Sequence, residues 1–486
     1  MKSYPVKVQD SIMSYTSYLG NNTFKFLNKE HCFEEKIDWN FQEYGNLWAY
    51  NLNYFEFLHQ QHFNKQEGLA FIHDFVNRKN DIRAGLAPYP ISLRNIFWIR
   101  FLIKNHLQDE KIDAFLYATY KVLSTHLEYH LLGNHLLENA FSLLFGAYYF
   151  QDKKLYHKAK NILKRELQEQ ISEDGAHFEL SPMYHSIMLY RVLDCYNLVV
   201  NNVVFEQELK DLLREKGEKM LAWLNEVTFS NGDIPLVNDA AFGIAPTPQQ
   251  LNEYALRLGL NCTKTVILKE SGYRKFKTDK FELLVDIGQI GPDYQLGHAH
   301  ADTFNFVLYA NNRPVIVDAG TSTYEVNKIR FYERSTAAHN TVVLLGRNSS
   351  EVWGGHRVAR RAKVYIIEEN GCSILAQHNG YRSMGIIHQR TWNLNDEKVV
   401  IEDSLIDNEV NSHLPGCIAK FHLDGSIKNI TVVGNTIAWQ GCTMIMTGAE
   451  KIEVREYEQA IGFNNRVPAK CIVAPFKHGM TTTILS

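Results

Sequence analysis

The segment from Gly297 to Val343 is dense in side chains that can do chemistry. Histidines, aspartates, tyrosines and arginines stand there among short apolar runs, among them His298, His300, His339, Asp302, Asp318, Tyr324, Tyr332, Arg313, Arg330 and Arg334. Imidazole and carboxylate groups brought together by a sheet are suitable ligands for a divalent metal. Tyrosine and arginine beside them suit acid–base chemistry on an acidic substrate. This combination favours an enzyme over a scaffold protein.

Three residues of this segment are candidate metal ligands because each lies beside a predicted strand: His300, Asp318 and His339. Three nitrogen or oxygen ligands, with a further position left to water, are common in zinc sites. The same ligands also fit manganese or nickel. The sequence therefore predicts a divalent metal, with zinc as the first expectation.

The expected strands place a condition on this metal site. Asn311-Asn312 is typical of a two-residue hairpin turn between two strands. A regular hairpin through this turn pairs Asp318 with Asn305 and not with His300. The three ligands can therefore converge only if the chain bends or bulges before Thr303.

A second polar group occurs in the segment GNHLLENA, residues 133–140. On a helix, Asn134 and Glu138 lie four residues apart, as do His135 and Asn139, so the four side chains crowd a limited arc. One interpretation is a hydrogen-bonded network that ties helices together, because buried polar groups need partners. The other interpretation is a functional site.

The segment FELSPMYHSIMLY, residues 178–190, contains the start of a helix. Ser181 followed by Pro182 is a signature of an N-cap and a first helical residue. Tyr184 then falls in the first turn, where the helix dipole favours negative charge and eases formation of a phenolate. A tyrosine at this place can act as a general acid or base, although an ordinary capped helix with a surface tyrosine explains the pattern equally well.

Other charged residues allow both functional and structural interpretations. Arg94 can clamp a carboxylate with two hydrogen bonds. A local basic patch near Trp353 and His356 suits an acidic ligand, but such charged runs are more often solvated surface. Asp233 and Asp239 have the residue type of a glycosidase carboxylate pair, but Asn-Gly-Asp and Asn-Asp are also turn formers.

Composition and length limit the classes of protein. A chain of 486 residues is long enough for two domains, with 45% hydrophobic residues as in soluble globular proteins. The net charge of −3 gives no support to nucleic-acid binding. Seven scattered cysteines without CxxC spacing do not predict a disulfide framework. Without an apolar signal-peptide core or a run of 18 apolar residues, we expect a cytoplasmic protein without membrane insertion, and export by another route stays open.

The elements expected along the chain fall into two classes. Apolar residues at helical spacing predict helices in the first half, over 46–63, 93–107, 112–132, 138–150, 184–200 and 206–227. After about residue 270, short alternating runs bounded by turn residues predict strands, over 281–288, 303–310, 314–320, 340–346, 362–369, 372–378, 398–406, 429–440 and 443–448. We therefore predict helical hairpins laid side by side, as in an α/α toroid or a solenoid, over residues 1–270. An antiparallel sandwich is expected over residues 271–486.

Taken together, these motifs resemble the heparinase II/III-like polysaccharide lyase superfamily, and most closely its branch among bacterial surface-polysaccharide genes. The motifs WAYNLNYFEFL, PYPISLRN, GNHLLENA, SPMYH, GHAHAD, DAGTSTY and STAAHNTV occur in the family's order between about Trp48 and Val364. The resemblance implies an incomplete α/α toroid followed by an antiparallel β-sandwich, with the active site in the cleft between them. It also implies a metal of largely structural role at His300, Asp318 and His339.

The resemblance further assigns roles to individual residues. Asn134 and His135 match the pair that engages a uronate carboxylate, Tyr184 matches the catalytic tyrosine, and His298 matches the active-site histidine. Tyr324 lies near a second tyrosine that some members use. We expect substrate contacts from the remaining polar candidates: Arg94, Glu138, His185, Arg330, Arg334, Trp353 and His356.

The expected activity is β-elimination on an acidic polysaccharide that contains uronate, such as a heparosan-like or heparan-like chain or another bacterial exopolysaccharide. A base must remove the proton at C5, and an acid must protonate the departing O4. Two alternatives stay open. One is a glycoside hydrolase on the same scaffold that uses Glu179, Asp233 or Asp239, and the other is a non-catalytic glycan-binding protein of a polysaccharide locus.

Overall fold

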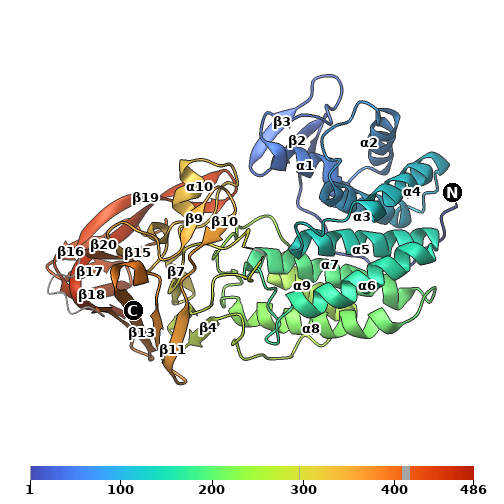
Figure 1. Ribbon diagram of the computed structural model, residues 1–486. Coiled ribbons are helices and arrows are strands. Elements are labelled where there is room, and N and C mark those ends of the chain that lie inside the picture. Colours follow the sequence, from blue (N-terminus) through green and yellow to red (C-terminus); the bar gives the residue numbers. More distant parts are fainter. Residues whose placement is uncertain (1, 295, 408–415) are drawn as a thin grey trace. The chain divides into compact units, whose positions relative to one another are not determined.

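The computed structural model describes residues 2–294, 296–407 and 416–486, and the chain forms two compact units (Figure 1). The helical unit comprises Met1–Gly175, Ser186–Ala222 and Ala245–Lys264. The sheet unit comprises Ala176–His185, Trp223–Ile244 and Thr265–Ser486. Two segments that the sequence places in the helical domain, Ala176–His185 and Trp223–Ile244, therefore belong to the sheet unit. Both of them carry candidate site residues.

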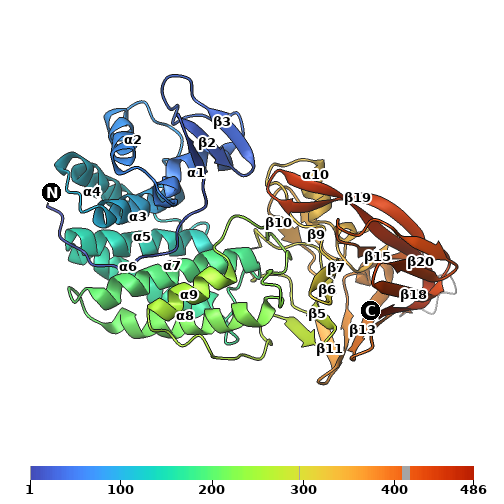
Figure 2. The same cartoon turned by 180° about the vertical axis from the view of Figure 1, so that it is seen from behind.

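Helices make up most of the first half of the chain. They are α1 (Asn46–Tyr54), α2 (Lys65–Asn77), α3 (Pro88–Lys104), α4 (Glu110–Thr125), α5 (Gly133–Phe150), α6 (Lys153–Gln170), α7 (Pro182–Asn201), α8 (Glu208–Val227) and α9 (Pro248–Arg257). A small antiparallel sheet, β1 (Tyr18–Gly20), β2 (Thr23–Phe26) and β3 (Lys29–Cys32), lies beside α1 in both ribbon views (Figures 1 and 2). The expected helices are present, with additional ones between them.

Local chemistry explains where several of these helices begin and end. The side chains of Asn64, Asp109 and Asp152 cap α2, α4 and α6, and each accepts hydrogen bonds from two backbone amides of the first turn. The helix predicted over 46–63 is instead broken at Phe55, which has a φ of 61°. A residue with left-handed backbone angles cannot continue a right-handed helix, so α1 ends there and a 3₁₀ turn (Glu56–His59) follows.

The second half of the chain forms antiparallel sheets. A four-stranded sheet has the order β4 (Tyr273–Lys277), β5 (Phe281–Asp286), β6 (Phe306–Ala310) and β7 (Arg313–Ile316). The 11-stranded sheet of the described residues contains β8 (Val342–Leu344), β11 (Val364–Glu369), β12 (Ser373–His378), β13 (Ile386–Leu394), β14 (Lys398–Asp407), β15 (Cys417–His422), β16 (Thr431–Val433), β17 (Thr436–Trp439), β18 (Cys442–Ala449), β19 (Glu453–Gly462) and β20 (Asn465–Leu485). A short hairpin of β9 (Glu351–Trp353) and β10 (Arg357–Ala359) and the helix α10 (Lys328–Glu333) complete the unit.

One apolar core joins the two larger sheets. Side chains of the four-stranded sheet, such as Phe281 and Leu308, pack in the same buried cluster as Trp392, Ile401 and Ile484 of the 11-stranded sheet. Buried residues alternate along β13 and β14, as expected for strands with one face toward a core. This is the two-layer packing of a β-sandwich, which confirms the predicted architecture of the second half.

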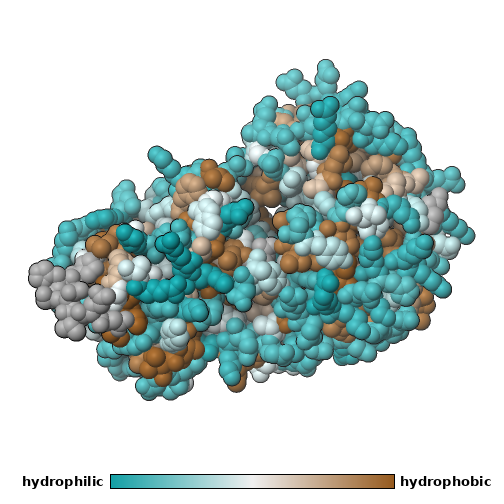
Figure 3. All heavy atoms as spheres, in the orientation of Figure 1, coloured by the Kyte–Doolittle hydropathy of each residue, from teal (hydrophilic) through white to brown (hydrophobic). Residues whose placement is uncertain are grey.

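The surface is polar over most of the face shown in Figure 3, where apolar residues form separate patches. Such scattered patches are normal for a folded domain in water. Among the residues that the structure describes, none of the helices combines the length and apolar character needed to span a bilayer.

Candidate active site

Tyr184 lies in the first turn of α7, as the sequence predicts. Ser181 precedes the helix, and its hydroxyl accepts a 3.4 Å hydrogen bond from the backbone amide of Tyr184. The Tyr184 ring stacks on the imidazole of His298 with 3.9 Å between ring centroids. Its hydroxyl lies 3.0 Å from the hydroxyl of Tyr324. Three residues from distant parts of the sequence thus meet in the sheet unit.

His298 is oriented by a carboxylate on one side of its ring. Its Nδ1 lies 2.9 Å from Oδ2 of Asp239, and its Nε2 lies 3.8 Å from a carboxylate oxygen of Glu179. A hydrogen bond from Nδ1–H to a carboxylate leaves the lone pair of Nε2 available, which is the arrangement of a general base. Asp239 therefore fixes both the tautomer and the direction of this imidazole.

Asp239 is the central anion of the site. Both oxygens of this buried carboxylate accept hydrogen bonds from the Arg330 guanidinium, one of them at 2.7 Å. Oδ1 of Asp239 also lies 2.8 Å from Nε2 of His300. Together these donors hold the pKa of Asp239 well below its usual range, although burial opposes them. The sequence pattern of Asp239 indicated only a turn or a hydrolase acid, and nothing local in it points to this role.

Arg330 extends the network to the loop after β9. Its guanidinium donates to the backbone carbonyl of Gly355 at 2.9 and 3.0 Å, and it lies 5.0 Å from the centre of the Tyr324 ring. His356 follows in the chain, and its ring centroid is 5.4 Å from that of Tyr324. Arg330 is completely buried, and its contacts position Asp239 and Tyr324. Its predicted contact with a substrate stays a prediction.

The two tyrosines are neutral phenols in this structure. Burial is the main cause that raises the pKa of Tyr184 and of Tyr324 well above the usual value. The proximity of the two hydroxyls raises the pKa of Tyr184 further. The expectation that the helix dipole eases formation of the Tyr184 phenolate is therefore wrong for the free protein, because burial outweighs the dipole. Tyr184 stands ready to donate a proton.

The chain forms the expected hairpin near the predicted metal ligands. Asn311 and Asn312 have φ values of 51° and 60° and form the expected two-residue hairpin. Asn305 meets Asp318, with 2.6 Å between its amide nitrogen and a carboxylate oxygen. Phe304, at a φ of 68°, turns the chain before this hairpin. His300 lies before β6 and outside the strand.

The three predicted ligands are buried but are not all gathered around one point. His339 Nδ1 lies 2.8 Å from Asp318 Oδ2, and the ring centroids of His300 and His339 are 5.4 Å apart. The other nitrogen of each ring, Nδ1 of His300 and Nε2 of His339, is buried without a hydrogen-bond partner. Buried imidazole lone pairs of this kind fit a metal ligand.

Within the described part of the chain, a different group has its ligand atoms within 4.8 Å of one another: Asp239, His298 and His356. This group is a poor cation site because Asp239 is already neutralised by Arg330 and accepts hydrogen bonds from two imidazoles. A further cation beside the guanidinium would be repelled. We therefore interpret this cluster as an oriented hydrogen-bond network.

Asn134 and His135 begin α5 in the helical unit. Asn134 is buried, and His135 is partly exposed with its Nδ1 3.1 Å from a carboxylate oxygen of Glu128. The same glutamate accepts a 2.9 Å hydrogen bond from the side-chain amide of Asn139. The polar segment is thus a connected hydrogen-bond network. The ring of His135 also packs against the ring of Tyr89.

Arg94 lies inside the helical core. It is completely buried, it donates to the backbone carbonyl of Gly85 at 3.0 Å, and its guanidinium lies 4.7 Å from the centre of the Phe75 ring. Burial lowers its pKa to about 9. This corrects the clamp predicted from sequence, because the apolar face of α3 carries the side chain into the helical core.

Three further substrate-binding candidates are also buried and structural. Glu138 accepts a 3.1 Å hydrogen bond from Arg191, and His185 accepts one of the same length from the backbone of His177. Arg334 donates to the backbone carbonyl of Ala299 at 2.9 Å. Their side chains have no exposed surface to offer a glycan. Trp353, at 45% exposure, and the exposed ring of His356 keep the accessibility that the prediction needs.

Comparisons with known proteins agree with this description. Two family models match the chain: "Heparinase II/III N-terminus" over residues 90–256 and "Heparinase II/III-like, C-terminal" over residues 264–470. A solved structure of heparinase III superposes with a TM-score of 0.69 at 15% identity, covering 93% of this chain and 80% of that one. This likeness shows the fold, an α/α toroid with a β-sandwich.

Two curated relatives are named heparin-sulfate lyase. The one from Bacteroides stercoris is 25% identical over 319 residues, 58% of this chain and 45% of the relative. The one from Pedobacter heparinus is 26% identical over 253 residues, 46% of this chain and 38% of the relative. The chain thus spans less than half the length of the curated relatives that it matches. From these matches and the shared fold, the chain belongs to the heparinase II/III-like superfamily.

Proposed function

We propose that this chain is a polysaccharide lyase that cleaves a uronate-containing acidic polysaccharide by β-elimination. The observation that carries the proposal is the placement of Tyr184, whose hydroxyl meets Tyr324 and whose ring stacks on His298. A phenol and an imidazole at van der Waals distance supply a proton donor and a proton acceptor for one sugar residue. The names of the two curated relatives support a substrate of the heparan type.

The reaction needs two proton transfers and no water. A base removes the proton from C5 of the uronate, and the electron pair of that bond forms the C4–C5 double bond. The bond between C4 and the glycosidic oxygen breaks, and an acid protonates the departing oxygen. The products are an unsaturated uronate at one new end and a hydroxyl group at the other.

We assign the base to His298 and the acid to Tyr184. The hydrogen bond from His298 Nδ1 to Asp239 leaves Nε2 as the acceptor, and Glu179 at 3.8 Å stabilises the imidazolium that forms. Tyr184 holds its proton because burial raises its pKa, so it can deliver that proton to the leaving oxygen. The hydroxyl of Tyr324 supports the charge left on Tyr184 during the transfer.

Asn134 and His135 are assigned to the uronate carboxylate. Hydrogen bonds and positive charge on this group stabilise the enolate-like anion that develops as C5 loses its proton. A carboxylate held in this way makes the C5 proton more acidic. Which face of the sugar carries that proton depends on the uronate, so the configuration at C5 selects the substrate.

The proposal includes a divalent metal, most simply zinc, at His300, Asp318 and His339. The two buried imidazole nitrogens without partners support it. When bound, the metal supplies structural cross-linking between the segments that carry these residues. His300 also contacts Asp239, so a proposed metal ligand lies beside the carboxylate that orients the proposed base.

A glycoside hydrolase that uses the predicted acids has less support. Asp239 accepts four hydrogen bonds from cationic or imidazole groups, and these hold its pKa low, so it cannot act as a general acid. Asp233 closes a turn with Asn231 and accepts a hydrogen bond from Tyr309 at 3.1 Å. These contacts occupy both carboxylates within the structure, and neither of them forms a glycosidase pair with the other.

The test is ultraviolet absorbance of unsaturated uronate with heparosan, heparan sulfate, hyaluronan, chondroitin, alginate and polyglucuronate. We expect a rise with one of these polymers that Tyr184→Phe lowers at least about a hundredfold. Tyr365→Phe, an exposed tyrosine of β11, is the matched control and should leave the rate unchanged. New reducing ends without ultraviolet absorbance would establish the hydrolase instead. Binding without either product would establish the glycan-binding protein.

A further inference from the structure

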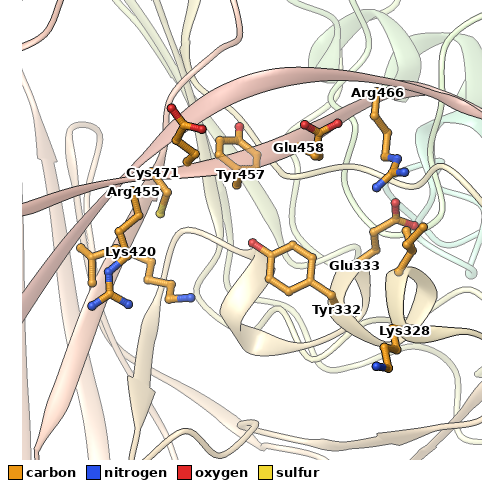
Figure 4. A pocket seen from close by; sticks show the side chains of 12 residues that line it. Lys328, Tyr332, Glu333, Lys420, Arg455, Tyr457, Glu458, Arg466 and Cys471 are labelled. Carbon is orange, nitrogen blue, oxygen red and sulfur yellow. The ribbon is translucent and has the colours of Figure 1, made fainter.

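A cavity lies in the sheet unit, apart from the residues of the proposed active site. It has a volume of about 420 Å³, and its lining residues come from α10, β15, β19 and β20. None of the active-site residues Tyr184, His298, Asp239 or Tyr324 lines it. The volume lies in the range of sites that bind small molecules or single sugar residues. Figure 4 shows the side chains that point into it.

The cavity is lined by four cationic side chains, Lys328, Lys420, Arg455 and Arg466, and by three glutamates, Glu333, Glu456 and Glu458. Among the described residues, no carboxylate lies within ion-pair distance of Lys328, Lys420 or Arg466, which all line it. Two of its glutamates are compensated: Glu456 by Lys470 at 2.7 Å, and Glu333 by hydrogen bonds from Ser322. Burial also raises the pKa of Glu333 to about 7, which reduces its negative charge at neutral pH.

Lys420 is the least exposed of the cations that line the cavity. Its ammonium group donates to the backbone carbonyl of Ala337 at 3.1 Å, which leaves two of its three protons for other acceptors. The side chain is partly buried, and burial lowers its pKa. A partly desolvated cation without a counter-ion costs free energy that a bound anion offsets. The amine therefore favours an anionic ligand.

An aromatic ring stands beside this amine. Tyr332 is 36% exposed, and in Figure 4 its ring lies between Lys420 on one side and Glu333 and Arg466 on the other. Tyr457 and Cys471 are buried and form part of the apolar floor. An accessible ring next to convergent charged groups is the composition of a site for an amphipathic ligand such as a sugar.

We propose that this cavity binds one anionic sugar residue, with a carboxylate or sulfate group facing Lys420 and the sugar ring against Tyr332. Arg466 at the rim then takes a neighbouring anionic group of the same glycan. The cavity thus forms a second saccharide site on the sheet unit, beyond the catalytic one. The choice of ligand rests on the proposed function, but binding here requires no turnover.

The experiment is calorimetric titration of the full chain carrying Tyr184→Phe, so that no substrate is consumed. The probes are a heparosan oligosaccharide, which offers carboxylates alone, and its N-sulfated counterpart. We expect Lys420→Met and Arg466→Gln each to weaken one binding event about tenfold, the loss of a charged hydrogen bond. Arg382→Gln, an exposed arginine outside the cavity, is the matched control and should bind unchanged. Tighter binding of the sulfated probe identifies sulfate as the recognised group, and equal binding identifies the carboxylate.

The outcomes separate this inference from the proposed function. Unchanged affinity and stoichiometry in both Lys420→Met and Arg466→Gln would overturn the second site, even if the wild-type chain releases unsaturated uronate. Binding that depends on Lys420 and Arg466 would support the site, even if no polymer is cleaved. Arg466 is exposed, so its variant still tests the site if Lys420→Met fails to fold.

Discussion

Asp239 and Arg330 form a bidentate ion pair, and both side chains are completely buried. The pair joins the segment before α9 to α10 within the sheet unit. On one side Asp239 holds His298 and His300, and on the other Arg330 lies against Tyr324. A single carboxylate thus connects the proposed base, the second tyrosine and a predicted metal ligand.

Replacing that carboxylate should damage both stability and catalysis. Asp239→Asn leaves a buried guanidinium without its counter-ion, which costs about 3–5 kcal/mol of unfolding free energy. His298 also loses the acceptor that orients it, so turnover should fall at least about a hundredfold. Urea unfolding and the ultraviolet assay measure the two effects.

Asp279→Asn, at an exposed aspartate of the same unit, is the control for this substitution and should change neither quantity. Wild-type stability in Asp239→Asn would show that the network around Asp239 does not hold the site together.

Tyr324 should matter less than Tyr184, although the two hydroxyls are in contact. Tyr324→Phe keeps the ring under Arg330 and removes the hydrogen bond of 3.0 Å to Tyr184. We expect kcat to fall about tenfold with little change in KM, because a hydrogen bond that supports the transition state contributes about 1–2 kcal/mol. Steady-state kinetics with the substrate identified above makes the comparison. A larger loss in Tyr324→Phe than in Tyr184→Phe would reverse the two assignments.

A metal bound at His300, Asp318 and His339 should raise the unfolding temperature of the protein. A ligand present at a hundred times its dissociation constant stabilises the folded state by about 2.7 kcal/mol. A chelator should therefore lower the unfolding temperature of the sheet unit, and added zinc should restore it. In His339→Gln the unfolding temperature should be lower and no longer respond to zinc.

The metal content of the purified protein, measured by mass spectrometry, provides an independent reading. Wild-type protein that contains no metal and does not respond to the chelator would contradict the predicted site. His106→Gln, in the loop after α3, is the control histidine substitution.

A buried, hydrogen-bonded pair of histidines in the β-sandwich should make the unfolding free energy depend on pH. His378 Nδ1 accepts a hydrogen bond from the backbone of Gly380, so its Nε2–H donates to His388 at 3.0 Å. His388 Nε2–H in turn donates to Asp403 at 2.7 Å, and Arg390 also pairs with this carboxylate. Both rings are buried, and burial is the main cause that lowers the pKa of each.

The sign of the pH effect follows from these pKa values. Below pH of about 6.5 the unfolded chain takes up a proton on each imidazole, whereas the folded state keeps both rings neutral. The contribution of the two neutral rings to the unfolding free energy is therefore complete above pH 6.5. Below that pH the unfolding free energy falls by at most about 1.4 kcal/mol per pH unit for each histidine. Asp403, whose pKa is lowered to about 2, adds a further loss below about pH 4.

Denaturant unfolding between pH 5 and 8 measures this slope. His378→Gln should make it shallower than in the wild type, while His478→Gln, at an exposed histidine of β20, should leave it unchanged. Identical slopes in His378→Gln and the wild type would show that this ring is not held neutral.

The sequence determined those features that depend on local patterns. Helical spacing and strand alternation gave the two fold classes, because the periods 3.6 and 2 reflect which face is buried. The Ser181-Pro182 cap placed Tyr184 in a first turn, and Asn311-Asn312 formed the expected two-residue hairpin turn between β6 and β7. These are short-range rules of backbone conformation.

Tertiary structure decided which polar side chains face a site and which are buried in ion pairs. The sequence suggested a carboxylate clamp for Arg94 and a turn residue or hydrolase acid for Asp239, but Arg94 lies in the helical core and Asp239 pairs with Arg330, His298 and His300. No pattern near Asp239 names Arg330 as its partner, since the two are 91 residues apart. Long-range pairing and burial depend on how elements pack, and that packing also set the raised pKa of Tyr184 against the expected effect of its helix.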